Sequence, residues 1–170
     1  MGCLIKSRGV RPIDELRFIV DHNVGKLARW LRLMGYDALF FDGSDDSELI
    51  AAALAEGRVI LTRDTQIMKR GIITSGRLKA IFIEGDKPEL QMCQVIDSLN
   101  LGSHFRPFTM CLECNQALLK RSKEQVKDRV PPYVFQTQNQ YMECPGCHRI
   151  YWRGTHWQKM SEKLQEFVKC

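Results

Sequence analysis

The sequence lacks any run of the roughly 18 consecutive apolar residues that would span a lipid bilayer. It also contains no internal repeat and no low-complexity tract. These absences argue against a transmembrane helix, a repeat solenoid and a disordered linker protein. The first 17 residues carry basic side chains but no apolar stretch of the kind found in secretory signals. We therefore expect a cytoplasmic protein that has no membrane partner.

Basic residues only slightly outnumber acidic residues. The chain has 25 Lys and Arg against 20 Asp and Glu, a formal net charge of +5. Most of the surplus falls after Pro107, where 10 basic side chains accompany 6 acidic ones. This bias favours a polyanionic partner. With 170 residues and 44% hydrophobic content, the chain suits one ordinary domain or a modest domain plus a small appended module.

Short apolar runs alternate with helical patterns over the first hundred residues. The apolar runs predict buried strands at residues 18–20, 38–41, 59–61 and 80–83. Apolar side chains at helical spacing predict helices at about 23–34, 47–56, 66–70 and from Pro88 onward. This alternation predicts an α/β fold in which helices flank a parallel sheet. In such folds, ligands bind beyond the carboxyl ends of the strands.

Composition divides the chain into three segments. They are an N-terminal lead-in, an α/β domain, and a cysteine-containing module that ends in an amphipathic helix, at residues 1–16, 17–103 and 108–170. The boundary is a stretch at 100–107 that contains Gly, Ser and Pro. Within the last segment we expect a charged helix around 123–129, then a break at two prolines and a β-rich stretch at 133–135.

Seven cysteines are an odd number, and four of them form two C-x-x-C pairs separated by 29 residues, Cys111 with Cys114 and Cys144 with Cys147. In a reducing compartment this doubled spacing predicts a zinc site rather than disulfides. Each pair bends so that two thiolates point toward one metal, and four thiolates leave no open coordination position. We therefore expect a structural zinc ion that stabilises the last segment.

Other histidines and cysteines are weaker metal candidates. His148 and His156 lie close enough in sequence to be alternative ligands. Cys3, Cys93 and Cys170 fall outside the paired pattern. Cys93 lies in a predicted helix and is interpreted as a small core residue.

Acidic side chains follow three of the predicted strands. Asp21 directly follows the first strand, Asp64 lies just past the third, and Asp46 begins the helix after the second. Because the carboxyl ends of parallel strands share one edge, we expect these three carboxylates to converge. Clustered carboxylates repel one another unless a hard cation such as Mg²⁺ or Mn²⁺ neutralises them. The acids therefore favour phosphodiester hydrolysis of a nucleic acid.

Each acid also has a structural interpretation when it is taken alone. Asp45, with Glu48 three residues later, or Asp46 itself, could cap the start of a helix. Asp64 could be a turn residue. The functional interpretation depends on several acids meeting at one edge, which is an inference from the expected topology.

Motifs in both halves of the chain closely resemble one known family. The first half contains FIVD, LARWLRLMGYD and GRVILTRD at residues 18–21, 27–37 and 57–64. The second half contains CLECN, VPPY, CPGC and YWRGTHW at residues 111–115, 130–133, 144–147 and 151–157. Over about residues 17–160, these motifs resemble the Mut7-C family of PIN-like ribonuclease domains.

The resemblance implies a PIN-like parallel sheet flanked by helices, followed by a small C-terminal zinc ribbon. It also implies a Mg²⁺- or Mn²⁺-dependent endoribonuclease that leaves a 5′-phosphate and a 3′-hydroxyl. Matched position by position, Asp21 is the first-strand acid and Asp64 is the acid of the T-R-D motif. The middle acid falls on Asp46, with Asp45 and Glu48 as neighbours that could take its place.

Two more positions follow from the same comparison. Asp86, after the fourth predicted strand, matches a fourth acid that is frequent in PIN domains. His22 stands where some relatives have a second acid. Fewer carboxylates would then hold the metal, and activity could be weak or need a partner.

Five basic side chains are candidate RNA contacts, namely Lys26, Arg29, Arg32, Arg63 and Arg153. The first three lie on the helix after the first strand, where they could also form an ordinary solvated face. Arg153 lies in the aromatic run at 151–157. The rings of this run could stack RNA bases or pack the last helix on the ribbon.

Our leading hypothesis is a metal-dependent ribonuclease in which Asp21, Asp46 and Asp64 hold one or two Mg²⁺ or Mn²⁺ ions. The zinc ribbon would extend its RNA-binding surface. The alternative is a non-catalytic RNA-binding or protein-adaptor module, in which the acids cap helices and the ribbon makes the contacts. The sequence carries no signature of a particular RNA, protein partner or oligomeric state.

Overall fold

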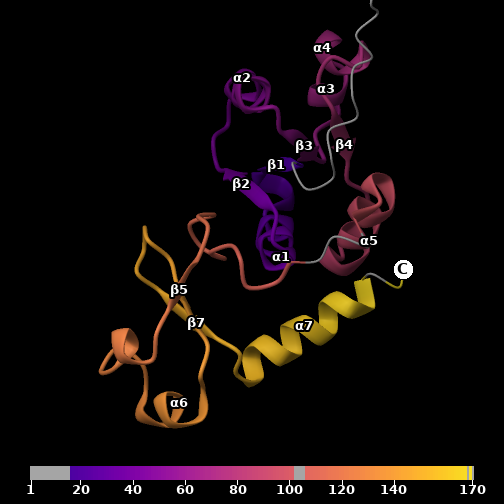
Figure 1. Cartoon of the computed structure of the whole chain (residues 1–170). Helices are drawn as coiled ribbons and strands as arrows, with labels where there is room; N and C mark the ends of the chain where they lie inside the picture. The colour runs from indigo at the N-terminus through magenta and orange to yellow at the C-terminus, as the bar shows by residue number, and fades with distance from the viewer. Residues whose placement is uncertain (1–15, 102–105, 168, 170) are drawn as a thin grey trace, which may run out of the picture.

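The polypeptide forms a four-stranded sheet and a smaller three-stranded sheet (Figure 1). This computed structural model describes residues 16–101, 106–167 and 169, so Cys3, Cys170 and nearly all of the lead-in at 1–16 lie outside it. The larger sheet has the strand order β2-β1-β3-β4, and all neighbouring strands are parallel. Its strands are β1 (Arg17–Asp21), β2 (Asp37–Phe41), β3 (Val59–Thr62) and β4 (Ala80–Phe82). The predicted α/β fold with a parallel sheet is confirmed.

Helices cover both faces of this sheet. Successive residues of a strand point to opposite faces, so each strand contributes side chains to two cores. Phe18 and Val20 of β1 belong to one core, together with residues of α1 (Lys26–Met34), α5 (Pro88–Leu99) and α7 (Thr155–Phe167). Ile19 belongs to a second core, with residues of α2 (Asp46–Glu56), α3 (Thr65–Met68) and α4 (Gly71–Thr74). In the described ranges, every helix is too short or too polar to cross a bilayer.

The smaller sheet is antiparallel and carries both cysteine pairs at its end. Its strands β5 (Leu119–Arg121), β6 (Tyr141–Glu143) and β7 (Ile150–Trp152) lie in the order β5-β6-β7. We call residues 108–152 the ribbon. The ribbon also contains the 3-10 helix η4 (Glu124–Val126) and the helix α6 (Pro132–Thr137).

Two sequence predictions for the ribbon need correction. The charged helix expected around 123–129 is reduced to the single turn η4, and the β-rich stretch expected at 133–135 is wrong because it lies in α6. Pro131 and Pro132 explain the second error. Proline is favoured at the first positions of a helix, so this pair starts a helix here.

An ion-paired glutamate lies inside the ribbon. Glu143 of β6 is 5% exposed. Its carboxylate accepts hydrogen bonds from Arg121 and Arg129, each at 2.6 Å. These bonds lower the pKa of Glu143 to about 2, so the carboxylate stays charged at neutral pH.

The C-terminal helix α7 runs from the ribbon back to the α/β domain (Figure 1). The ring of Phe167 meets the ring of Trp30 edge-on, with centres 5.0 Å apart. Lys163 Nζ lies 2.5 Å from Glu89 Oε1 on α5. The sequence analysis placed α7 in the same segment as the ribbon. These contacts show that α7 also packs on the α/β domain.

Arg32 and Asn115 fasten the ribbon to the α/β domain. Arg32 is 7% exposed, and burial lowers the pKa of its guanidinium. The guanidinium donates hydrogen bonds of 2.9, 2.9 and 3.0 Å to the carbonyl oxygens of Ala38, Leu112 and Glu113. Asn115 Oδ1 accepts a hydrogen bond from the Ala38 N–H at 2.8 Å. We therefore leave Arg32 out of the RNA contacts proposed below.

Replacing Arg32 by Ala should destabilise the protein by roughly 3 kcal/mol, because three carbonyl oxygens at the junction lose a charged donor. Arg29→Ala is the matched control. Arg29 lies on the same helix but is exposed, and it should contribute less than about 1 kcal/mol through its ion pair. Chemical denaturation followed by circular dichroism measures both changes. Equal losses for the two variants would contradict the role assigned to Arg32.

Candidate functional site

Asp21 and Asp64 follow the neighbouring strands β1 and β3 and are linked by one hydroxyl group. Asp21 is 3% exposed, and its Oδ2 accepts a hydrogen bond from the Thr62 hydroxyl at 2.5 Å. The same Thr62 oxygen accepts a hydrogen bond from the Asp64 backbone N–H at 2.9 Å. The other carboxylate oxygen of Asp21 lies 2.8 Å from His22 Nδ1. The two acids thus reach the same edge of the sheet.

Three more candidate acids, Asp45, Asp46 and Glu48, lie at the start of α2. Asp45 caps α2 by accepting the N–H two residues later at 2.7 Å, and Asp64 caps α3 in the same way at 2.6 Å. Asp46 and Glu48 lie in the first turn of α2, where negative charge is favourable. Among the described residues, no Lys or Arg forms an ion pair with Asp21, Asp46 or Asp64. The three carboxylates also do not form a close group of ligands there.

A cavity of about 400 Å³ opens beside this edge of the sheet. We call it the edge cavity. It is lined by η2 (His22–Val24), the start of α1 and residues that follow β3 and β4. Lys26 and Arg63 bring positive charge to it, and the Arg63 guanidinium lies 2.6 Å from the exposed carboxylate of Asp86. The candidate fourth acid is therefore an ion-pair partner of a candidate RNA contact.

Sequence reasoning missed two polar residues at this edge. Thr62 is fully buried, and its hydroxyl connects Asp21 to Asp64. Asn23 Oδ1 accepts a hydrogen bond from the Arg63 N–H at 3.2 Å, a second link between the ends of β1 and β3. A threonine at the end of a buried apolar strand is a signal, since a buried hydroxyl needs a partner. No sequence signal marks Asn23.

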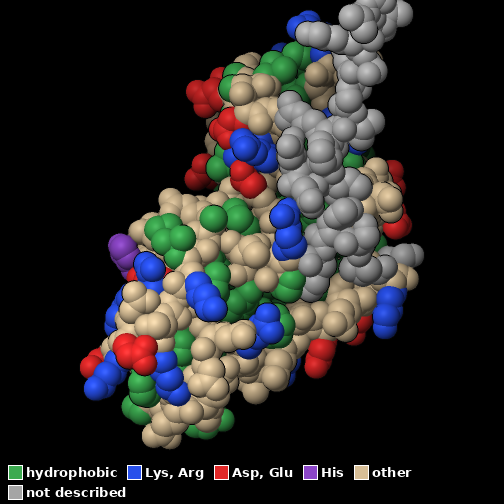
Figure 2. Space-filling view, in the orientation of Figure 1, with side chains coloured by type: hydrophobic (Ala, Val, Ile, Leu, Met, Phe, Trp, Pro, Cys, Tyr) green, Lys and Arg blue, Asp and Glu red, His purple; other side chains and the backbone are tan. Residues whose placement is uncertain are grey.

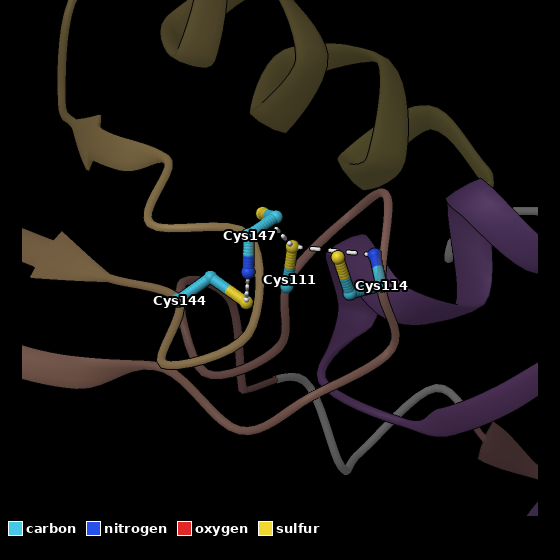
Figure 3. Close-up of side chains that lie close together, drawn as sticks. All are labelled: Cys111, Cys114, Cys144 and Cys147. Atoms are coloured by element: carbon cyan, nitrogen blue, oxygen red, sulfur yellow. Dashed lines mark hydrogen bonds between the residues drawn. The ribbon is translucent and has the colours of Figure 1, made fainter.

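Four cysteine sulfurs from two chain segments point toward one another in the ribbon (Figure 3). Their Sγ atoms all lie within 4.8 Å of one another, and those of Cys111 and Cys147 are 3.7 Å apart. Tetrahedral zinc with Zn–S bonds of about 2.3 Å requires sulfurs about 3.8 Å apart. The donor set and its spacing therefore fit a metal such as zinc.

The two cysteine pairs have the same backbone geometry. In each pair the N–H of the second cysteine donates to the sulfur of the first, at 3.3 and 3.5 Å. The residues that follow, Asn115 and His148, have φ angles of 59° and 57° and close each turn. The ring of His148 is 72% exposed and faces Glu143 at 3.5 Å, and His156 is exposed on α7. Neither histidine joins the group that the four cysteines form.

Thiol pKa values explain why this cluster suits a cation. Burial opposes ionisation of Cys111, but hydrogen bonds from Tyr151 and from backbone N–H groups outweigh it and lower the pKa of this thiol to about 7. The neighbouring Cys147 raises the pKa of Cys114 to about 12. Several thiolates therefore cannot coexist here at neutral pH unless a metal ion neutralises them.

The candidate basic residues occupy different places. Lys26 and Arg63 line the edge cavity, whereas Arg32 is buried at the junction. Arg29 and Arg153 line a second cavity, where α1, the ribbon and α7 meet. Figure 2 shows acidic side chains near α2 and basic side chains spread over the lower half of the molecule, which contains the ribbon and α7 in Figure 1.

The fold and its sites define an α/β domain with an appended four-cysteine ribbon. The model of the Mut7-C RNAse domain matches residues 16–164, and the chain belongs to this family. It is also 31% identical over 120 residues to a human protein described as exonuclease mut-7 homolog. That match covers 68% of this chain and 14% of the human protein, so the chain spans a small part of its curated relative. No solved structure matches significantly.

Removal of the metal from the ribbon should lower the unfolding temperature by on the order of 10 °C, because the cysteines lose the ion that neutralises their charge. Elemental analysis should find one zinc per chain, and Cys111→Ser should lose it. Differential scanning calorimetry before and after chelation measures the effect. Zn²⁺, but not Mg²⁺, should restore the original transition. An unchanged transition in fully metal-free protein would contradict the assignment.

Proposed function

We propose that this protein is a metal-dependent ribonuclease, an endoribonuclease by its resemblance, with a PIN-like catalytic domain at residues 17–103 and a structural zinc ribbon with a C-terminal helix at 108–170. It would hydrolyse phosphodiester bonds of cytoplasmic RNA and leave a 5′-phosphate and a 3′-hydroxyl. Membership of the Mut7-C RNAse domain family supports a nuclease-related role. The human relative is described as an exonuclease homolog, which supports the same class of chemistry.

The observation that carries this proposal is the pair of carboxylates at the ends of β1 and β3. The Thr62 hydroxyl donates to the Asp21 carboxylate and accepts from the Asp64 backbone N–H, and Asp46 begins the helix that follows the neighbouring strand β2. In many α/β proteins, ligands bind beyond the carboxyl ends of the parallel strands. In our proposal, Asp21 and Asp64 hold the metal, and Asp46, or its neighbour Asp45 or Glu48, completes the site.

The donor set fits a hard divalent cation. Carboxylate oxygens are the ligands that Mg²⁺ and Mn²⁺ prefer, and none of these three acids has a Lys or Arg partner within the described ranges. When bound, such an ion would supply water activation and neutralisation of the charge on the scissile phosphate. Thr62 would hold the Asp21 carboxylate in place, and His22 would limit access to its other oxygen.

Lys26 and Arg63 are the proposed phosphate contacts at the edge cavity. Both side chains are exposed and line the edge cavity. Its lining begins at His22, the residue after Asp21, and does not include Asp21, Asp46 or Asp64. A phosphate there would compete with Asp86 for the Arg63 guanidinium, because that carboxylate lies 2.6 Å away on an exposed loop. Arg29 and Arg153 would contact RNA farther from the scissile bond.

The alternative function is a non-catalytic RNA-binding or protein-adaptor module. The specific observation in its favour is that Asp45 and Asp64 both cap helices, with hydrogen bonds of 2.7 and 2.6 Å. Titration calorimetry distinguishes the two functions. The nuclease requires Mg²⁺ or Mn²⁺ to bind zinc-loaded protein and requires Asp21→Asn to weaken that binding, whereas the adaptor shows neither effect.

Asp21→Asn and Asp64→Asn should each lower Mn²⁺-dependent cleavage of RNA by roughly 100-fold or more, because each removes a negative ligand without changing side-chain size. Gel analysis of end-labelled single-stranded and hairpin RNA measures the rate and identifies the product ends. Asp97→Asn is the matched control, since Asp97 is an exposed carboxylate near the end of α5 and is not one of the candidate acids. Cleavage that survives both substitutions would refute the site.

A further inference from the structure

The second cavity has a volume of about 620 Å³ and lies between α1, the ribbon and α7. We call it the aromatic groove and define it by Arg29, Tyr133, Arg149, Trp152, Arg153 and Trp157. We propose that the aromatic groove binds unpaired bases of single-stranded RNA, and that Glu113 occupies the position that an RNA phosphate takes on binding. This inference rests on the proposed function in taking RNA as the polymer.

Tyr133 gives the groove an aromatic side chain that is available for stacking. Tyr133, near the start of α6, is 74% exposed, although most large aromatic side chains bury much of their surface. Trp152 and Trp157 line the same cavity and are half-buried. Stacking of a base on an aromatic side chain contributes binding free energy whichever base is present, because every base has a flat face. A volume of this size belongs to the class that encloses small organic ligands.

Arg153 combines stacking with charge. Its guanidinium lies 5.1 Å from the centre of the Trp157 ring and 5.9 Å from that of Phe108. Phe108 and Trp157 in turn meet edge-on, with ring centres 5.6 Å apart. A guanidinium stacked in this way still presents N–H donors at its edge, and these can bind a phosphate.

Glu113 shares its carboxylate between two arginines of the groove. Its Oε1 lies 3.3 Å from Arg29 Nη1 and 3.1 Å from Arg149 Nη1. The two arginines come from α1 and from the loop after the second cysteine pair, and all three side chains are substantially exposed. Exposed ion pairs of this kind contribute little stability. A phosphate can therefore replace the carboxylate and bind both guanidinium groups.

Helix α1 connects the groove to the edge cavity. Lys26 lines the edge cavity and Arg29 lines the aromatic groove. Residues three apart lie on the same side of a helix with a rise of about 4.5 Å. A strand whose phosphates follow these two side chains would place bases in the groove and a phosphate in the edge cavity.

The shape of the site favours a single strand over a duplex. In a duplex the base faces are stacked on one another, and proteins contact mostly phosphates and sugars. A concave cavity with aromatic walls instead takes bases that have left the stack. Three arginines against one glutamate give the groove a positive charge, which matches a polyanion.

Binding of a fluorescein-labelled 12-nucleotide oligouridine to the full chain tests this site. The titration uses zinc-loaded protein in buffer without Mg²⁺ or Mn²⁺, so that cleavage does not interfere. Tyr133→Ala should weaken binding about tenfold through the loss of one stacked base. Glu113→Gln should tighten binding severalfold, an effect that misfolding cannot produce. Arg153→Gln should reduce the slope of log K against log salt concentration by about 0.7.

Two matched variants control for changes outside the groove. Leu90→Ala removes an exposed apolar side chain from α5, and Glu124→Gln removes an exposed carboxylate from η4. Both should bind oligouridine as the unmodified protein does. Unchanged affinity in Tyr133→Ala and Glu113→Gln would overturn the proposal. Equal binding of a 12-base-pair RNA duplex, or of a polyglutamate peptide, would also overturn it.

The outcome separates this inference from the proposed nuclease activity. If Mn²⁺ supports no cleavage but the groove variants change oligouridine affinity as stated, the nuclease proposal fails and the groove stands. If RNA is cleaved in an Asp21-dependent manner but Tyr133→Ala and Glu113→Gln leave affinity unchanged, the groove proposal fails alone.

Discussion

The buried guanidinium of Arg32 is the contact on which the arrangement of the two sheets depends. It extends from α1 and donates to one carbonyl of β2 and two carbonyls of the first cysteine turn. Removing the ribbon would take two acceptors from a buried guanidinium and the Asn115 acceptor from the Ala38 N–H, which is costly in the interior of a protein. The α/β domain and the ribbon are therefore held in one orientation. Because Leu112 and Glu113 also line the aromatic groove, the same contact fixes the shape of that cavity.

At the sheet edge, Asp64 can cap a helix and bind a cation at the same time. Asp64 caps α3 with one carboxylate oxygen, but a carboxylate has two oxygens and about four acceptor positions. The capping bond therefore leaves Asp64 able to bind a cation while it fixes the orientation of the side chain. Asp21 is more constrained, because both of its oxygens have partners in Thr62 and His22. His22 is the partner at the exposed side, so a cation that binds Asp21 has to displace this histidine or share its carboxylate.

The sequence predicted those features whose cause is local. The four strands were found because strands buried on both faces are continuous apolar runs, and the four-cysteine cluster was found because C-x-x-C spacing brings two sulfurs together. Arg32 was misjudged because a charged residue on an amphipathic helix is normally solvated, and its partner Leu112 lies 80 residues away. The return of α7 to α5 was missed for the same reason, since it depends on contacts such as Lys163 with Glu89. Whether Asp46 joins Asp21 and Asp64 around an ion stays a prediction.

In our proposals, the positively charged aromatic groove attracts RNA, and the negatively charged acids at the sheet edge hold the catalytic metal. Carboxylates at the sheet edge repel a phosphate until a cation is bound, so the edge alone is a poor site for initial capture of RNA. The aromatic groove carries the opposite charge and attracts the polymer without a catalytic metal. Helix α1 joins the two, with Lys26 at one cavity and Arg29 at the other. Glu113 then sets the affinity of the groove, because it is an anion already bound to two of its arginines and RNA has to displace it. An RNA bound through this groove would reach the acids with its backbone already aligned along α1, which lowers the entropy lost when the scissile phosphate is positioned.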